Sequence, residues 1–294
     1  MRRREFVCSL GATFAWPLAA RAEQAGATRR VGILTTLAED DPEDRALLGA
    51  FRQRLAELGS VEGRDVQFAY RRTMGRPDLA RTFASEMAAA KPDVILVVGG
   101  TASSVLLKQT RIVPTVFVTD TDPVGAGWIA SFARPGGNTT GFVSFENTQG
   151  PKWLELLKEM APGLERVVIL RADNPQAGTV LPTIKAALPS FNLQATDVVI
   201  QDAPDIERAI DKAAAEPHVG LLVLSSTVAY FNRDLISART ASRRLAAVYT
   251  NSVFPRSGGL LSYGVDRVEQ FRQAAGYIVS VPPTLLSSAD EVIE

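Results

Sequence analysis

The side chains that most often carry nucleophilic or acid–base chemistry are nearly absent from this chain. It contains one histidine, His218, and one cysteine, Cys8. A Ser-His-Asp or Cys-His nucleophile needs a base that titrates near neutral pH, and zinc sites need several Cys or His ligands. His218 directly precedes a predicted strand, so we interpret it as a loop residue. We expect no enzyme activity, no metal site and no cofactor.

Two nucleotide-binding motifs differ in how far the sequence matches them. The sequence has no G-x-x-x-x-G-K-[ST] phosphate loop, but residues 125–130 match G-x-G-x-x-A after a predicted strand at 114–119. A dinucleotide fingerprint starts immediately after the first strand of its βαβ unit, whereas here residues 120–124 intervene. The spacing therefore argues against dinucleotide binding.

Small polar residues recur where predicted strands end. Ligands of open α/β sheets bind just outside the carboxyl ends of the strands, where hydroxyls, amides and helix N-termini can receive a carboxylate. The same residue types also cap helices, so each one alone is equivocal. Their recurrence in both halves of the chain favours a ligand site. The candidates are Thr35, Thr36, Gly100, Thr101, Asp120, Thr121, Ser225, Ser226, Thr227 and Asn251.

The elements that must position these residues alternate between strand and helix. Short apolar runs read as buried parallel strands, and apolar residues at helical spacing lie between them. A Gly/Pro-rich stretch at 134–138 separates two such series, which predicts an α/β fold of two Rossmann-like lobes with parallel sheets. One large sheet is the alternative. Strands are expected at 29–35, 65–70, 93–98, 114–119, 166–170, 194–200, 219–224 and 247–249, and helices at 44–58, 78–90, 102–109, 152–160, 180–188, 205–215 and 235–245.

The first 22 residues have the order of a secretory signal peptide. Arginines at positions 2 to 4 precede an apolar stretch at 6–20, and Ala20-Arg21-Ala22 supplies a small-x-small cleavage site. Both the general secretory route and the twin-arginine route fit this pattern. Cys8 has no lipobox, so we expect no lipid anchor. The sequence predicts an exported, soluble, periplasmic protein.

The net charge and the length of the chain after signal-peptide cleavage indicate what it could bind and how it could fold. Four of the 32 basic residues and one of the 32 acidic residues lie in the leader, which leaves 28 against 31 and a net charge of −3. This mixed balance argues against a nucleic-acid surface. The mature chain has no disulfides, because the only cysteine lies in the leader. Its hydrophobic core must therefore hold it together, and about 270 residues are enough for two lobes.

Five segments resemble the ABC-transporter substrate-binding proteins of the tryptophan/tyrosine-binding type. The central ones are DPVGAG at 122–127 and ARPGGNTTG at 133–141, and they are followed by 153–159, 258–264 and 289–294. The resemblance implies a type I periplasmic binding fold with lobes joined by hinge strands. The N-terminal lobe would comprise 29–142 plus 262–294, and the C-terminal lobe 143–261.

The resemblance also implies a function. A monomer would bind a small organic solute, such as an aromatic amino acid or a related acid or amide, and pass it to a membrane permease and an ATPase. It adds Tyr263 and Asp266 to the candidate ligand contacts. Tyr230, Tyr249 and Tyr263 would either sandwich a planar ligand or pack in the core and hinge.

The sequence departs from this family at one place, and two other classes of function remain open. After Ile278 the family continues with a further hinge strand, but here residues 279–286 follow directly, which predicts a looser clamp and leaves a non-transporting member possible. A ligand-sensing module is equally compatible with the sequence. An enzyme on a doubly wound fold would have to use carboxylates such as Asp120 and Asp122.

Overall fold

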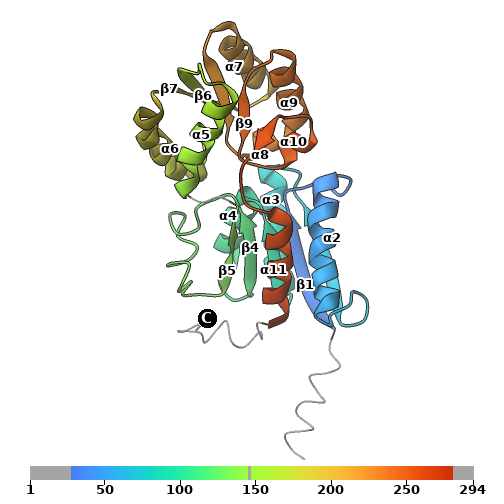
Figure 1. Ribbon diagram of the computed structural model, residues 1–294. Coiled ribbons are helices and arrows are strands. Elements are labelled where there is room, and N and C mark those ends of the chain that lie inside the picture. Colours follow the sequence, from blue (N-terminus) through green and yellow to red (C-terminus); the bar gives the residue numbers. More distant parts are fainter. Residues whose placement is uncertain (1–27, 145–146, 281–294) are drawn as a thin grey trace, which may run out of the picture.

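The computed structural model describes residues 28–144 and 147–280, which form two lobes, each built on a five-stranded parallel sheet (Figure 1). The first sheet has the order β2-β1-β3-β4-β5 and the second has the order β10-β9-β8-β6-β7. The first contains β1 (Arg29–Thr35), β2 (Val66–Arg72), β3 (Val94–Val98), β4 (Thr115–Thr119) and β5 (Thr139–Val143). The second contains β6 (Arg166–Arg171), β7 (Gln194–Val199), β8 (Val219–Val223), β9 (Ala247–Tyr249) and β10 (Leu261–Ser262).

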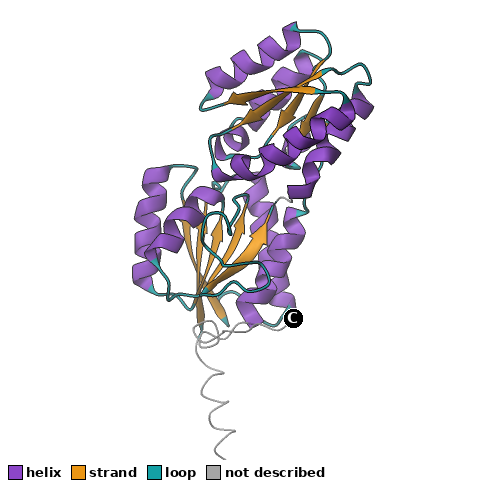
Figure 2. Cartoon of the chain, turned by 90° about the vertical axis from the view of Figure 1, so that its left-hand side faces the viewer, coloured by secondary structure: helices purple, strands orange, loops and turns teal. Residues whose placement is uncertain are grey.

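Helices cover both faces of each sheet (Figure 2). This arrangement confirms the predicted α/β class with two parallel sheets and rules out the single-sheet alternative. The first lobe has α2 (Pro42–Glu57), α3 (Pro77–Ala90), α4 (Gly100–Gln109) and α11 (Arg267–Ser280). The second lobe has α5 (Gly150–Met160), α6 (Pro175–Ala187), α7 (Ala203–Ala215), α8 (Thr227–Phe231), α9 (Arg233–Ser242) and α10 (Val253–Arg256), with short 3-10 turns η1 (Asn147–Gln149) and η2 (Leu188–Phe191).

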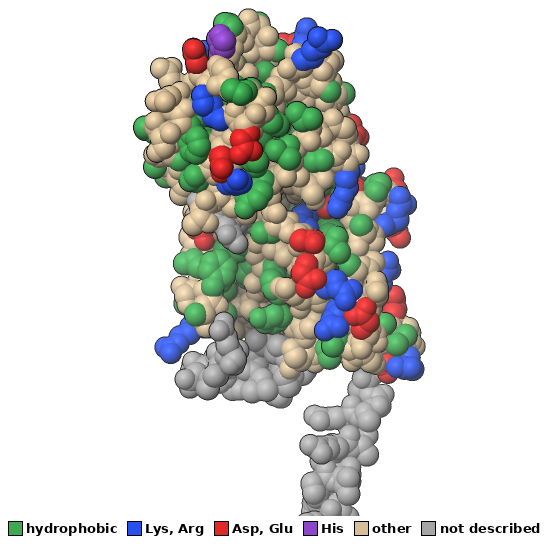
Figure 3. All heavy atoms as spheres, in the orientation of Figure 1, with side chains coloured by type: hydrophobic (Ala, Val, Ile, Leu, Met, Phe, Trp, Pro, Cys, Tyr) green, Lys and Arg blue, Asp and Glu red, His purple; other side chains and the backbone are tan. Residues whose placement is uncertain are grey.

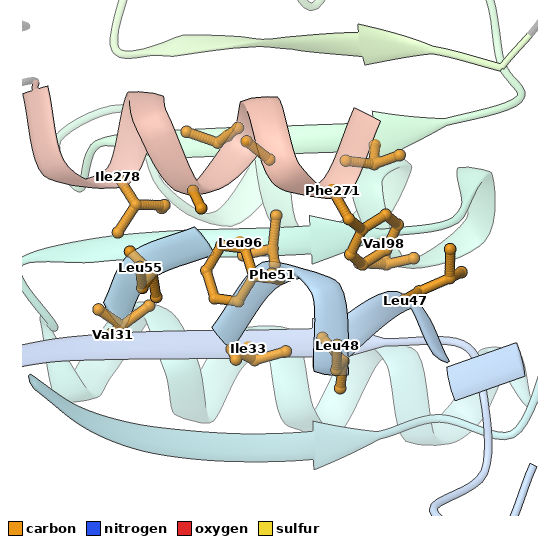
Figure 4. Packing of buried hydrophobic residues seen from close by; sticks show 14 of the residues in the cluster. Val31, Ile33, Leu47, Leu48, Phe51, Leu55, Leu96, Val98, Phe271 and Ile278 are labelled. Carbon is orange, nitrogen blue, oxygen red and sulfur yellow. The ribbon is translucent and has the colours of Figure 1, made fainter. Parts of the chain in front are cut away.

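The core of the first lobe brings the last helix back onto the first one. Phe51 of α2 and Phe271 of α11 are buried together above strands β1 and β3 (Figure 4). The opposite face of this sheet is covered by α3 and α4, through side chains such as Met87 and Leu106. In the second lobe, Trp153 belongs to a cluster of buried hydrophobic residues under α5 and α6. A second hydrophobic cluster lies under α7 and α9. Each lobe therefore has its own hydrophobic core.

Among the described residues the chain passes between the lobes at two places, which lie side by side. The side-chain amide of Gln270 donates to the carbonyl of Val143 at 2.7 Å and accepts from the hydroxyl of Ser144 at 3.1 Å. The indole of Trp153 donates to the carbonyl of Tyr263 at 2.8 Å. These bonds tie the end of β5 and the segment after β10 to helices, so both crossings are anchored.

Two predictions lie wholly or mostly outside the described residues: the signal peptide at 1–22, and the departure from the family pattern after Ile278, of which only residues 279 and 280 are described. Among the described residues, no helix combines the length and the apolar character needed to cross a membrane. Basic and acidic side chains are interspersed over the face shown in Figure 3, as the mixed composition suggested.

Truncation of Phe271 tests the return of α11 to the first lobe. Its side chain is 1% exposed, so Phe271→Ala is expected to lower the free energy of unfolding by about 3–5 kcal/mol. Gln273→Ala on the exposed side of the same helix is the control and should change it by less than about 0.5 kcal/mol. Urea denaturation followed by circular dichroism measures both. Equal stability of the two variants would contradict the packing described.

Candidate ligand-binding site

A cleft between the lobes gathers loops from both sheets. Because the strands are parallel, their carboxyl ends meet at one edge of each sheet, and these two edges face each other across the cleft. The first lobe and the crossings contribute Thr36, Leu37, Val98, Gly99, Gly100, Val118, Thr119, Asp120, Ser144 and Arg267. The second lobe contributes Ser225, Ser226, Thr227, Tyr230, Phe231, Asn251 and Phe254.

Most of the residues predicted from strand ends lie at this cleft. Its lining includes Thr36, Gly100, Asp120, Ser225, Ser226, Thr227 and Asn251. Thr101 and Thr121 line the adjoining outer part of the cleft, which shares Gly100, Asp120 and Thr227 with the inner part. The structure thus brings together residues that are separated by more than half of the chain.

Three predicted residues are not part of the cleft lining. Thr35 is buried, and its hydroxyl accepts a hydrogen bond from the backbone of Leu37 at 3.2 Å. Asp266 accepts from the backbone N–H groups at the start of α11, at 2.9 and 3.2 Å, and so caps that helix. Tyr263 lies at the second crossing with its side chain partly exposed. Their observed contacts are structural.

The inner part of the cleft is lined by one acidic and one basic side chain, Asp120 and Arg267. Burial raises the pKa of Asp120 above its usual range, while its own backbone N–H, that of Gly100 and the charge of Arg267 act in the opposite direction. Arg267 opens α11, has a largely buried side chain and also contacts Glu43 at 3.2 Å. Asp120 therefore lies where a cationic group would be stabilised.

Arg267 was missed in the sequence, as were Ser144, Phe231 and Phe254. Nothing local marks Arg267 as a cleft residue, because an arginine in the first turn of a helix is ordinarily a surface residue. Its buried partner Glu43 is 224 residues away along the chain. Only the folded arrangement of the two lobes reveals it.

The aromatic residues fall into two groups. Tyr230 and Phe231 from α8 and Phe254 from α10 line the cleft. Tyr249 is fully buried, stacks on Phe254 at 4.8 Å between ring centroids and shares a 2.7 Å hydrogen bond with Thr240. The cleft therefore has aromatic surface on the side of the second lobe, and Tyr249 supports it from the core behind.

Polar side chains at and next to the cleft also shape the loops that carry them. The Ser226 hydroxyl accepts from the N–H of Ala229 at 3.1 Å and caps α8. The Thr250 hydroxyl accepts from the N–H of Ser225 at 2.8 Å. The Asn251 side chain accepts from the N–H of Val253 at 3.0 Å. In Ser226, capping and cleft lining are therefore combined in one residue, rather than being alternatives.

The other chemistry-bearing motifs have structural roles. His218 is an exposed loop residue with a positive φ of 59°, and its carbonyl accepts from Glu165 and Arg166 at the start of β6. The 125–130 motif begins in a turn in which one Asp122 carboxylate oxygen accepts from Val124 and Gly125, both at 3.0 Å, and no helix follows it. Across residues 28–144 and 147–280 no group of three or more His, Cys, Asp or Glu side chains could hold a metal ion.

Two α/β lobes, each with a parallel sheet, enclose a polar and aromatic cleft, an arrangement that can close on a small solute. A family model described as ABC transporter substrate binding protein matches residues 30–282. The chain therefore belongs to this family, which is non-enzymatic. The prediction that the protein is not an enzyme is thereby confirmed.

Individual relatives are distant. A tyrosine-binding protein of Clostridioides difficile is 21% identical over 239 residues, covering 81% of this chain and 68% of that protein. A conserved domain protein of Vibrio cholerae has a TM-score of 0.79 and 20% identity, covering 89% of this chain and 88% of the other. The ABC domain from Streptococcus pneumonia, solved in complex with L-Trp, has a TM-score of 0.78 and 19% identity over 87% of each chain. At these identities the solved structures establish the fold.

Substitution of Gly99 tests the backbone conformation that places the start of α4 at the cleft. Gly99 has φ 92° and ψ 148°, and a Cβ there would lie 1.9 Å from the Thr36 hydroxyl oxygen. Gly99→Ala is expected to lower the free energy of unfolding by more than about 1–3 kcal/mol, the cost of the backbone conformation alone. Gly49→Ala is the control, since a Cβ there meets nothing within 4 Å in α2, and it should stabilise by about 0.5–1 kcal/mol. Chemical denaturation that ranked both variants as neutral would contradict this account.

Proposed function

We propose that this protein is the exported solute-binding component of an ABC importer and captures an amino acid with an aromatic side chain. The observation that carries the proposal is the coexistence of Asp120, Arg267 and several aromatic rings in one interlobe cleft. A permease and an ATPase in the inner membrane would be its partners.

The cleft offers a complementary group for each part of such a ligand. An ammonium group would be stabilised by Asp120, whose carboxylate is desolvated. A carboxylate would pair with Arg267 and accept from the N–H groups at the start of α4. An aromatic ring would lie against Tyr230, Phe231 and Phe254. The names of the tyrosine-binding relative and of the structure solved with L-Trp support this ligand class.

The described residues also support a working clamp. Both observed crossings are anchored by hydrogen bonds, and α11 is packed on the first lobe through Ile278. The looser hinge predicted for the segment after Ile278 stays a prediction, because that segment lies almost wholly outside the described residues.

The ammonium group separates this proposal from general binding of aromatic acids. Thermal shift and calorimetry with L-tryptophan and L-tyrosine are expected to show binding, whereas indole-3-propionate, which lacks the ammonium group, should bind far more weakly. Asp120→Asn should weaken amino-acid binding about 10- to 100-fold, the range for a hydrogen bond to a charged group. Asp234→Asn, an exposed acidic residue of α9, is the matched control and should bind as the wild type does. Equal affinity for the acid and the amino acid would exclude an ammonium site at Asp120.

The proposal also predicts a pH dependence. Burial raises the pKa of Asp120 in the free protein, and a bound ammonium group would lower it again, so binding releases a proton when Asp120 starts protonated. Affinity for L-tryptophan should therefore fall as the pH drops through the raised pKa. Calorimetry between pH 7 and pH 4 should show this decline in the wild type and a flat profile in Asp120→Asn. Identical profiles would show that Asp120 does not carry the interaction.

A further inference from the structure

Two carboxylates at the start of α2 are buried where the first lobe meets the second. The side chains of Asp41 and Glu43 are 7% and 3% exposed. Their position favours a negative charge, because Asp41 caps α2 by accepting from the N–H of Glu43 at 2.9 Å, and the N-terminus of a helix carries a partial positive charge. A buried carboxylate still needs a cationic or hydrogen-bonding partner to offset its loss of water.

Those partners come mainly from the other lobe. The guanidinium of Arg233, at the start of α9, lies 3.2 Å from Asp41. The guanidinium of Arg256, at the end of α10, pairs with one Glu43 oxygen, and Arg267 of the returning helix lies 3.2 Å from the other oxygen. Figure 1 shows α10 next to the N-terminal end of α2, across the boundary between the lobes. Neighbouring Asp44 differs, since its partner Arg72 belongs to the same lobe.

Both carboxylates also contact side chains that shape the ligand cleft. Glu43 holds Arg267, which lines the cleft. Arg233, held by Asp41, lies over the ring of Tyr230 at 4.8 Å from its centroid, and Tyr230 also lines the cleft. The contact region at α2 is therefore linked directly to the cleft by two residues.

The ion pairs Asp41–Arg233 and Glu43–Arg256 would make closure of the two lobes depend on these charged side chains. When the lobes separate, Asp41 and Glu43 regain water and lose Arg233 and Arg256. When the lobes close, the carboxylates lose water, and the two arginines of the second lobe supply the compensation. A closed state without those arginines would leave Asp41 buried without its ion-pair partner and Glu43 with Arg267 alone, which is unfavourable.

We propose that Asp41 and Glu43 form a charge latch with Arg233 and Arg256 that stabilises the closed arrangement of the lobes. The latch lies outside the ligand-lining surface. It goes beyond the proposed function, because it would operate whichever solute the cleft takes.

The test removes the two arginines of the second lobe, using the double variant Arg233→Gln/Arg256→Gln of the whole protein. Small-angle X-ray scattering without ligand should show a larger radius of gyration than the wild type, since the closed population falls. With L-tryptophan as the probe, dissociation measured by stopped flow should accelerate about fivefold or more, the scale of a partly exposed ion pair. Arg256→Lys, which keeps the charge, should restore much of the compactness relative to Arg256→Gln.

Arg166→Gln is the matched control. Arg166 pairs with Glu216 within the second lobe, at similar exposure to Arg256, so its loss should leave scattering and dissociation unchanged. Identical scattering of the wild type and the double variant, both correctly folded by circular dichroism, would overturn the latch. Absence of L-tryptophan binding would count against the proposed ligand only, because the ligand-free scattering still decides whether the latch exists.

Discussion

The architecture depends on the packing of α11 against the first lobe. Phe271, Ala274 and Ile278 bury the last described helix against α2 and the first sheet, although the preceding residues belong to the second lobe. The chain must therefore pass between the lobes twice. Gln270, on the same helix, bonds to Val143 and Ser144 at the first crossing, which keeps the two crossings adjacent. Two lobes joined by adjacent crossings can move about them as a hinge.

The packing of α11 against the first lobe also brings the residues of the candidate ligand site together. With the crossings on one side, the carboxyl ends of both sheets face the same cleft, and α11 begins at its edge. Arg267 thereby lies near Asp120 at the cleft and contacts Glu43 on the other side. One guanidinium is thus shared between the surface that would hold the ligand and the surface where the lobes meet. Under the proposed function, this residue would connect ligand binding with closure of the lobes.

Much of the fold was predictable, because buried parallel strands such as β3, VILVV, are continuous apolar runs. The missed strands lack that signal: β5 is TTGFV and mostly half-buried, and β10 has two residues. The short helices α8 and α10 were missed because four or five residues carry no helical period. Strand-end reasoning placed Asp120 and Ser226 at the cleft. It could not find Arg267, whose role depends on contacts across the whole chain, and the family resemblance pointed instead to neighbouring Asp266, which caps the helix.

A crystal structure of the protein grown with L-tryptophan would show directly whether the interlobe cleft binds an aromatic amino acid. We expect one ligand in the interlobe cleft, with its ammonium group within hydrogen-bonding distance of Asp120 and its carboxylate paired with Arg267. The indole would lie against the aromatic residues of α8 and α10. A ligand bound outside the cleft, or bound in the cleft with Asp120 and Arg267 both uninvolved, would contradict the account.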